Sequence, residues 1–89
     1  MTNSLIAIFG SKVRVKLLLC LADKSKNVTE LVTTCGLSQS AISQHLARLR
    51  QVGLVEARND GREVWYSLKS KKAAVICRLL LSLESEISS

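Results

Sequence analysis

A run of amide, hydroxyl and arginine side chains near the middle of the chain carries the clearest chemistry in the sequence. On a helical wheel, Ile42, Leu46 and Leu49 share one side of this run, and that side would pack on a core. The other side lacks the glutamate and lysine of an ordinary solvated helix. Glutamine and serine bond to base edges in the major groove, and arginine suits phosphates. We therefore expect DNA contacts from Ser38, Gln39, Ser40, Ser43, Gln44, Arg48 and Arg50.

The roles expected within this set differ. The arginines would hold phosphates, which provides affinity and register, whereas base reading falls to Gln39, Ser40, Ser43 and Gln44. The alternative is a polar face that only solvates the helix. His45 lies beside the apolar side, where a structural hydrogen bond to the backbone is favoured over a phosphate contact. The chain has no second histidine to complete a metal site.

Turn-forming residues mark a second candidate contact further along the chain. Asn59-Asp60-Gly61 lies between two segments with a period of two, residues 54–58 and 62–68, and Asp-Gly is a strong hairpin signal. Long side chains at a hairpin tip reach outward to phosphate or into the minor groove. The alternative is a solvated turn in which arginine pairs with aspartate. The residues expected to contact DNA here are Arg58, Asn59 and Arg62.

Five helices and one hairpin would position these groups. Thr29 is the expected cap of the third helix, and Gly36 is expected to end it in a left-handed conformation. Trp65 and Tyr66 fall on opposite faces of the returning strand, and the sequence leaves open which of them packs on the core. The element order predicts a mainly α fold with a small β-hairpin, the winged helix-turn-helix, in one domain over residues 1–89. Periodicity, caps and glycines place the helices at residues 1–9, 11–23, 29–35, 38–52 and 70–87.

Composition and charge agree with a nucleic-acid partner. Lysine and arginine number 13 against seven acidic residues, giving a net charge of +6 and a pI near 9.7. Such a balance suits a polyanion such as DNA, and the alternative is a solubilising surface. The sequence predicts no secretory signal, no membrane span and, with three widely spaced cysteines, no disulfide framework. We therefore expect a cytoplasmic location and no cofactor.

An excess of apolar residues at both ends of the chain predicts a homodimer. A domain of 89 residues is marginal alone, yet 47% of its residues are hydrophobic. The last helix carries more apolar surface than the stripe that one domain covers, and the first helix shares this excess. The alternatives are a last helix that packs wholly on its own domain or against an unrelated protein. The expected interface residues are Leu5, Ile8, Phe9, Ile76, Leu79, Leu80 and Leu83.

Six segments of the sequence resemble the ArsR/SmtB family of regulators in order and spacing. The resemblance implies a homodimeric transcriptional regulator that binds an imperfect palindrome in a promoter, with the first and last helices forming the dimer interface. The leucine-rich sequence of the last helix is similar to that of HlyU-type members of the family. The segments cover nearly the whole chain and comprise residues 9–15, 28–31, 37–46, 49–50, 53–55 and 61–68.

The same resemblance bears on what the protein senses. Metal sensors of the family often carry Cys-x-Cys before the turn, where this chain has only Cys35, and others use Asp, His and Glu in a last helix that here lacks Asp and His. No metal site is therefore expected. Another branch senses oxidants or persulfides through two cysteines. Cys20 matches the first position, Ser85 stands at the second, and Cys77 is the nearest thiol. The favoured interpretation is that the cysteines are simply small residues of the core. The alternative is that Cys20 and Cys77 form a redox pair.

These observations favour a sequence-specific DNA-binding transcriptional regulator, a repressor or anti-silencer, that binds a palindromic operator as a homodimer. The alternatives are a winged-helix module that binds protein, a plasmid or phage control protein without a ligand, and a thiol-based redox sensor repressor. An enzyme is disfavoured, because the sequence lacks a nucleophile–base pair and a glycine-rich phosphate loop.

Overall fold

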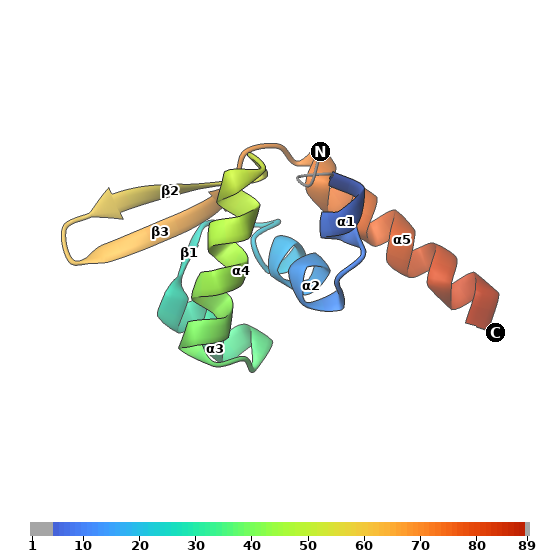
Figure 1. Cartoon of the computed structure of the whole chain (residues 1–89), viewed down its shortest axis with the longest axis horizontal. Coiled ribbons are helices and arrows are strands. Elements are labelled where there is room, and N and C mark those ends of the chain that lie inside the picture. The colour runs from blue at the N-terminus through green and yellow to red at the C-terminus, as the bar shows by residue number, and fades with distance from the viewer. Residues whose placement is uncertain (1–4, 89) are drawn as a thin grey trace.

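The computed structural model describes residues 5–88, which form five helices and a small three-stranded sheet (Figure 1). The predicted mainly α architecture with a β-hairpin, the winged helix-turn-helix, is confirmed. Residues 1–4, which the sequence placed in the first helix, lie outside the described residues. In chain order the elements are α1 (Leu5–Phe9), α2 (Lys12–Cys20), β1 (Lys26–Asn27), α3 (Val28–Cys35), α4 (Gln39–Gln51), β2 (Val55–Asp60), β3 (Glu63–Leu68) and α5 (Lys72–Ser88).

Helix caps made by neighbouring residues lie where the sequence predicted them. The hydroxyls of Ser11 and Ser38 each accept a hydrogen bond from the backbone N–H three residues on, at 3.3 Å before α2 and 3.1 Å before α4. Gly36 ends α3 with a φ of +70°. One end differs, because α2 stops at Cys20 rather than Asp23. The backbone N–H groups that follow it donate to carbonyls three residues back, which tightens the chain into a turn.

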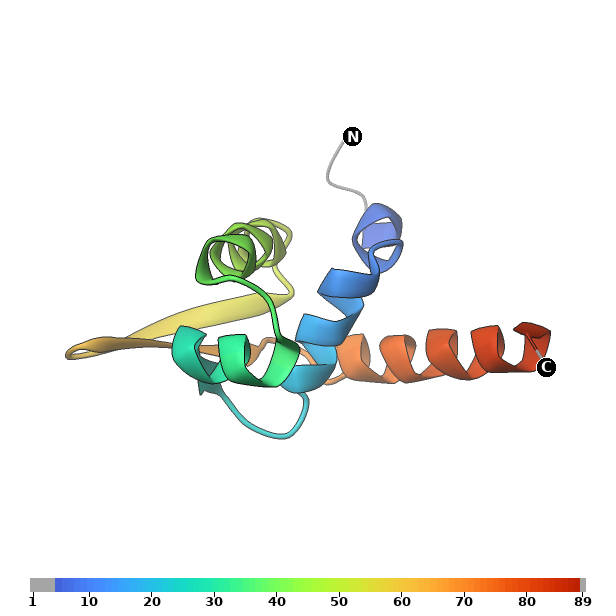
Figure 2. The same cartoon turned by 90° about the horizontal axis from the view of Figure 1, so that it is seen from below.

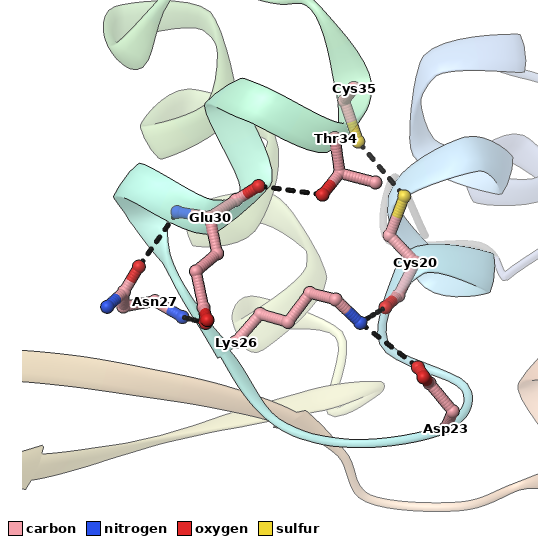
Figure 3. Close-up of polar contacts among 7 residues, drawn as sticks. All are labelled: Cys20, Asp23, Lys26, Asn27, Glu30, Thr34 and Cys35. Carbon is pink, nitrogen blue, oxygen red and sulfur yellow. Dashed lines mark hydrogen bonds and ion pairs between the residues drawn. The ribbon is translucent and has the colours of Figure 1, made fainter.

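The start of α3 differs from the prediction by about two residues. Asn27, rather than Thr29, is the cap: its Oδ1 accepts from the backbone N–H of Glu30 at 2.8 Å. The Glu30 carboxylate in turn accepts from the backbone N–H of Asn27 at 3.2 Å. Figure 3 shows these side chains facing each other at the start of α3. This reciprocal pair is a capping box, and it satisfies two donors that a helix start otherwise leaves free.

The sheet has the order β1-β3-β2, with both pairs antiparallel. The last pair of the hairpin joins Asp60 to Glu63, so that its loop consists of Gly61 and Arg62. The sequence placed the turn at residues 59–61, one position too early. A two-residue loop needs a positive φ at its first position, which Gly61 supplies with a φ of +66°. β1 was not predicted, because two residues are too few to show an alternating pattern.

One apolar core joins the helices to the root of the hairpin. Tyr66 packs against this core from β3, which answers the question that the sequence left open between Tyr66 and Trp65. Apolar burial of this kind is the main favourable contribution to folding. The largest fully buried side chains are Ile8, Leu17, Leu18, Leu31, Ile42, Leu46, Leu49, Val55 and Cys77.

The first helix is used differently from the prediction. Ile8 is 0% exposed in the chain's own core, so its assignment to a dimer interface is wrong. Phe9 is half-buried and also packs against this core. The reason is that the five-residue α1 packs against α2 and turns Ile8 and Phe9 inward. Leu5, which is 48% exposed, remains available to a partner.

The hairpin and α5 project from opposite ends of the molecule, with the other helices between them (Figures 1 and 2). The molecule is correspondingly elongated, with extents of 46 × 31 × 22 Å. Figure 2 shows α5 running out past the first helices, so that its C-terminal half lies beyond the body of the domain. The fold therefore separates the helix pair and hairpin from the long apolar helix.

Candidate nucleic-acid interface

α3 and α4 form two helices joined by a tight turn. α3 lies across the N-terminal end of α4 (Figures 1 and 2). The turn starts at Gly36, whose left-handed conformation reverses the chain, and ends at Ser38, which caps α4. Leu37 between them is half-buried and packs on the core. The turn thus holds α4 in a defined orientation and leaves its N-terminal end at the surface.

α4 buries one side and exposes the other, as the periodicity predicted. Ile42, Leu46 and Leu49 are each 0% exposed. His45 is half-buried at the edge of the apolar side. Arg48 is also half-buried, and its Nε is buried with no acceptor among the described residues. The remaining residues of the predicted set on this helix are exposed, namely Ser38, Gln39, Ser40, Ser43, Gln44 and Arg50.

Positive charge is concentrated on α4 rather than on the hairpin. No acidic residue occurs between Glu30 and Glu56, so Arg48 and Arg50 have no acidic neighbour in the sequence. The hairpin, in contrast, carries its arginines among acidic residues, and its last pair places Asp60 opposite Glu63. A polyanion would therefore be attracted to α4 and meet a mixed surface along the hairpin.

The two hairpin arginines are further apart than the sequence suggested. Arg62 lies in the two-residue loop at the tip and is exposed. Arg58 is set back in β2, where it pairs across the hairpin with Trp65. Since side chains alternate along a strand, Trp65 lies on the face opposite Tyr66 and the core. Arg58 shares that face, so only Arg62 extends from the tip itself.

A hydrogen bond links the start of α3 to the hairpin. The Asn27 side-chain amide donates to the Glu63 carboxylate at 3.0 Å. Asn27 also pairs with Trp65 in the register of β1 and β3. Asn27 therefore caps α3 and holds the hairpin at a fixed position beside the helix pair. This role is not visible in the sequence, because the two partners lie 36 residues apart and no local pattern connects them.

Residues 5–88 contain neither a metal-binding cluster nor a membrane-spanning helix. In that range no three His, Cys, Asp or Glu side chains gather closely enough to hold a metal ion. None of the helices described there is long and apolar enough to cross a membrane. The polar face of α4 and the hairpin remain the features that the structure offers for recognition.

Two helices joined by a tight turn and followed by an antiparallel hairpin define a winged helix-turn-helix protein of the DNA-binding transcriptional regulator class. The chain belongs to the bacterial regulatory protein, ArsR family, whose family model matches residues 11–57. The family suggested by the sequence resemblance is thus confirmed.

Relatives and solved structures agree with this membership. The chain is 40% identical over 76 residues to the transcriptional activator HlyU of Vibrio cholerae, a match that covers 85% of this chain and 70% of the relative. It is 39% identical over 66 residues to the regulator YgaV of Escherichia coli, covering 72% and 67%. The crystal structure of the transcriptional repressor BigR of Xylella fastidiosa aligns with a TM-score of 0.82 at 32% identity, covering 92% of this chain and 83% of that one.

Proposed function

We propose that the chain recognises a specific promoter operator as a homodimer and regulates transcription by occupying it. The single observation that carries this proposal is the exposed face of α4, where amides and hydroxyls near the capped N-terminal end are followed by arginines. Short uncharged side chains allow a helix to approach base edges closely, and a capped N-terminus can donate N–H groups to phosphate. The proposed base-reading residues are Gln39, Ser40, Ser43 and Gln44.

The phosphate contacts come from α4 and the hairpin. Arg48 and Arg50 follow the base-reading residues along the helix, and Arg62 lies at the exposed tip of the hairpin. Arg58 and Asn59 lie further back on the hairpin and complete the set. These contacts supply affinity and register on the duplex, whereas sequence preference comes from the helix.

The dimer is supported by apolar surface on α5. A helix on a monomer rarely keeps such a contiguous patch exposed, and a second copy can cover it around a two-fold axis. A groove beside it is lined by Phe9, Leu19 and Leu80, which connects the patch to α1 and α2. Such an axis would place the two copies of α4 about 34–36 Å apart, which matches the spacing of successive major grooves on one face of B-DNA. The exposed apolar residues of α5 are Val75, Ile76, Leu79, Leu81, Leu83 and Ile87.

Operator occupancy accounts for either direction of regulation. Among the relatives, HlyU is named an activator and PagR of Bacillus anthracis is named a repressor. A bound dimer represses when it excludes the transcription machinery, and it activates when it displaces a silencing protein. We propose occupancy, rather than catalysis, as the whole of its action, in the cytoplasm where promoter DNA lies.

The test combines a binding selection with two matched substitutions. Purified protein is used to select its preferred sites from genomic DNA, and the best site is then measured against all single base-pair changes. Gln44→Ala should relax preference at particular base pairs and cost about 1–3 kcal/mol there. Gln51→Ala, about 10 Å further along the same side of α4, is the control and should leave the preference intact. Unchanged affinity and preference in Gln44→Ala would refute the assignment of this face.

A further inference from the structure

Two thiols from separate helices meet where α2 and α3 end. The Sγ atoms of Cys20 and Cys35 lie 3.1 Å apart in a thiol–thiol hydrogen bond, as Figure 3 shows. The sequence suggested Cys77 as the partner of Cys20, but Cys77 is 0% exposed within the apolar core. The thiol that contacts Cys20 is therefore Cys35.

The two thiols differ in their access to solvent. Cys20 is half-buried, whereas Cys35 is only 5% exposed. Burial is the main reason that the pKa of the Cys35 thiol is raised to about 11, with the hydrogen bond to Cys20 acting in the same direction. A small reactant that approaches the surface meets Cys20 first, with Cys35 directly behind it.

Two ammonium groups flank the thiols and tie down the backbone on both sides. Lys16 donates to the carbonyl oxygen of Cys35 at 3.3 Å. Lys26 donates to the carbonyl oxygen of Cys20 and pairs with Asp23 at 3.0 Å. These bonds fix the backbone of both cysteines, so the two sulfurs are held in contact.

We propose that Cys20 and Cys35 form a dithiol site that a hydroperoxide oxidises to an intrachain disulfide. The Cys20 thiolate attacks one peroxide oxygen, which stays on the sulfur, the O–O bond breaks, and the other oxygen leaves as water or an alcohol after taking up a proton. Cys20 becomes a sulfenic acid. The Cys35 sulfur then attacks Cys20 Sγ, its proton is released, and the hydroxyl departs as water. Each hydroperoxide thus removes two electrons and two hydrogens from the pair, and two thiols of a small reductant restore it.

The closure that this requires is small. A disulfide holds its sulfurs about 2.05 Å apart, so the two Sγ atoms must approach by roughly 1 Å. The two cysteines are the last residues of α2 and α3, and the segment between these helices contains only a turn and the short β1. The bond would tie α2 to the end of α3, three residues before Ser38, the cap of α4. The disulfide would thereby link the helix-turn-helix of α3 and α4 covalently to α2.

The three cysteines can be told apart by one digest. Cleavage after lysine and arginine places Cys20 in residues 17–24, Cys35 in residues 27–48 and Cys77 in residues 73–78. Reduced full-length protein is treated with hydrogen peroxide, remaining thiols are alkylated after denaturation so that the buried Cys77 is reached, and the peptides are identified by mass spectrometry. The expected product links residues 17–24 to residues 27–48, with Cys77 alkylated in full. A link from Cys20 to Cys77, a link between chains, or Cys20 over-oxidised with no link would overturn the proposal.

Substitutions provide a second, independent measurement. Cys77→Ser should still form the bond at an unchanged rate. Cys35→Ser should leave Cys20 as a sulfenic acid that a dimedone probe captures, with at least a tenfold gain in captured probe over the wild type. Equal capture in both proteins would mean that Cys35 does not resolve Cys20. Circular dichroism checks that each variant is folded. The peptide map of the wild-type protein tests the proposal independently of these variants.

Discussion

Arg62 offers the sharpest test of how the hairpin takes part in binding. It lies in the loop that joins β2 and β3 and is exposed, so Arg62→Ala removes one charge without disturbing a packed side chain. Because arginine at this position would hold phosphate rather than a base, the loss should weaken binding to all sequences alike. It should also reduce the dependence of affinity on salt, because fewer counterions are released.

The size of the change follows from the geometry of a dimer with two hairpins. Each phosphate contact contributes about 0.9 to the slope of log affinity against log salt, so the loss of two contacts should flatten the slope by roughly 1.8. Between about 50 and 200 mM salt, the variant should therefore lose about tenfold less affinity than the wild type. The nearby Asp60 and Glu63 carboxylates do not change this expectation, because they are present in both proteins.

The assay is fluorescence anisotropy of a labelled operator and of a scrambled duplex, titrated at several salt concentrations. Lys24→Ala is the control, since Lys24 is exposed in the loop between α2 and β1, which lies on the side of the molecule away from α4 (Figure 2). It changes the net charge equally. If Arg62→Ala and Lys24→Ala altered the slope by the same amount, the hairpin would contribute only through general charge, and the proposed contact would be refuted.

Four further outcomes are expected. Leu79→Glu, at a position that is 64% exposed on α5, should give monomers in sedimentation and abolish operator binding, whereas Val64→Glu, 38% exposed on the hairpin, should remain dimeric. Leu46→Ala should lower the free energy of unfolding by about 2–5 kcal/mol in a urea titration, while Ser43→Ala on the exposed side should change it by less than about 0.5 kcal/mol. The disulfide proposed above closes a loop of 15 residues and should raise the free energy of unfolding by about 3 kcal/mol, an increase that a reductant removes. Burial raises the pKa of Cys35 to about 11, so the fraction of Cys35 present as thiolate grows as the pH rises towards that value. The sulfenic acid on Cys20 should therefore convert to the disulfide faster near pH 9 than near pH 7. A conversion rate independent of pH would contradict this order of events.

The sequence alone was sufficient for features that depend on neighbouring residues. The caps at Ser11 and Ser38 and the left-handed Gly36 involve hydrogen bonds or dihedral angles within a few residues, so local chemistry predicts them. The two sides of α4 follow from helical periodicity, since Ile42 and Leu46 must face one way while the residues between them face another. These local rules also placed the helix pair before the hairpin, which is the arrangement that defines the candidate interface.

Only the tertiary structure decided features that join distant parts of the chain. Asn27 caps α3 and also bonds to Glu63, so the start of that helix and the position of the hairpin depend on one residue that local propensity did not select. Cys20 contacts Cys35 because α2 and α3 end side by side, a proximity that spacing along the chain does not reveal. Ile8 enters the core because α1 packs against α2. In each case the partner lies outside the three- or four-residue reach of a helical turn, and packing of the elements determines which side chains meet.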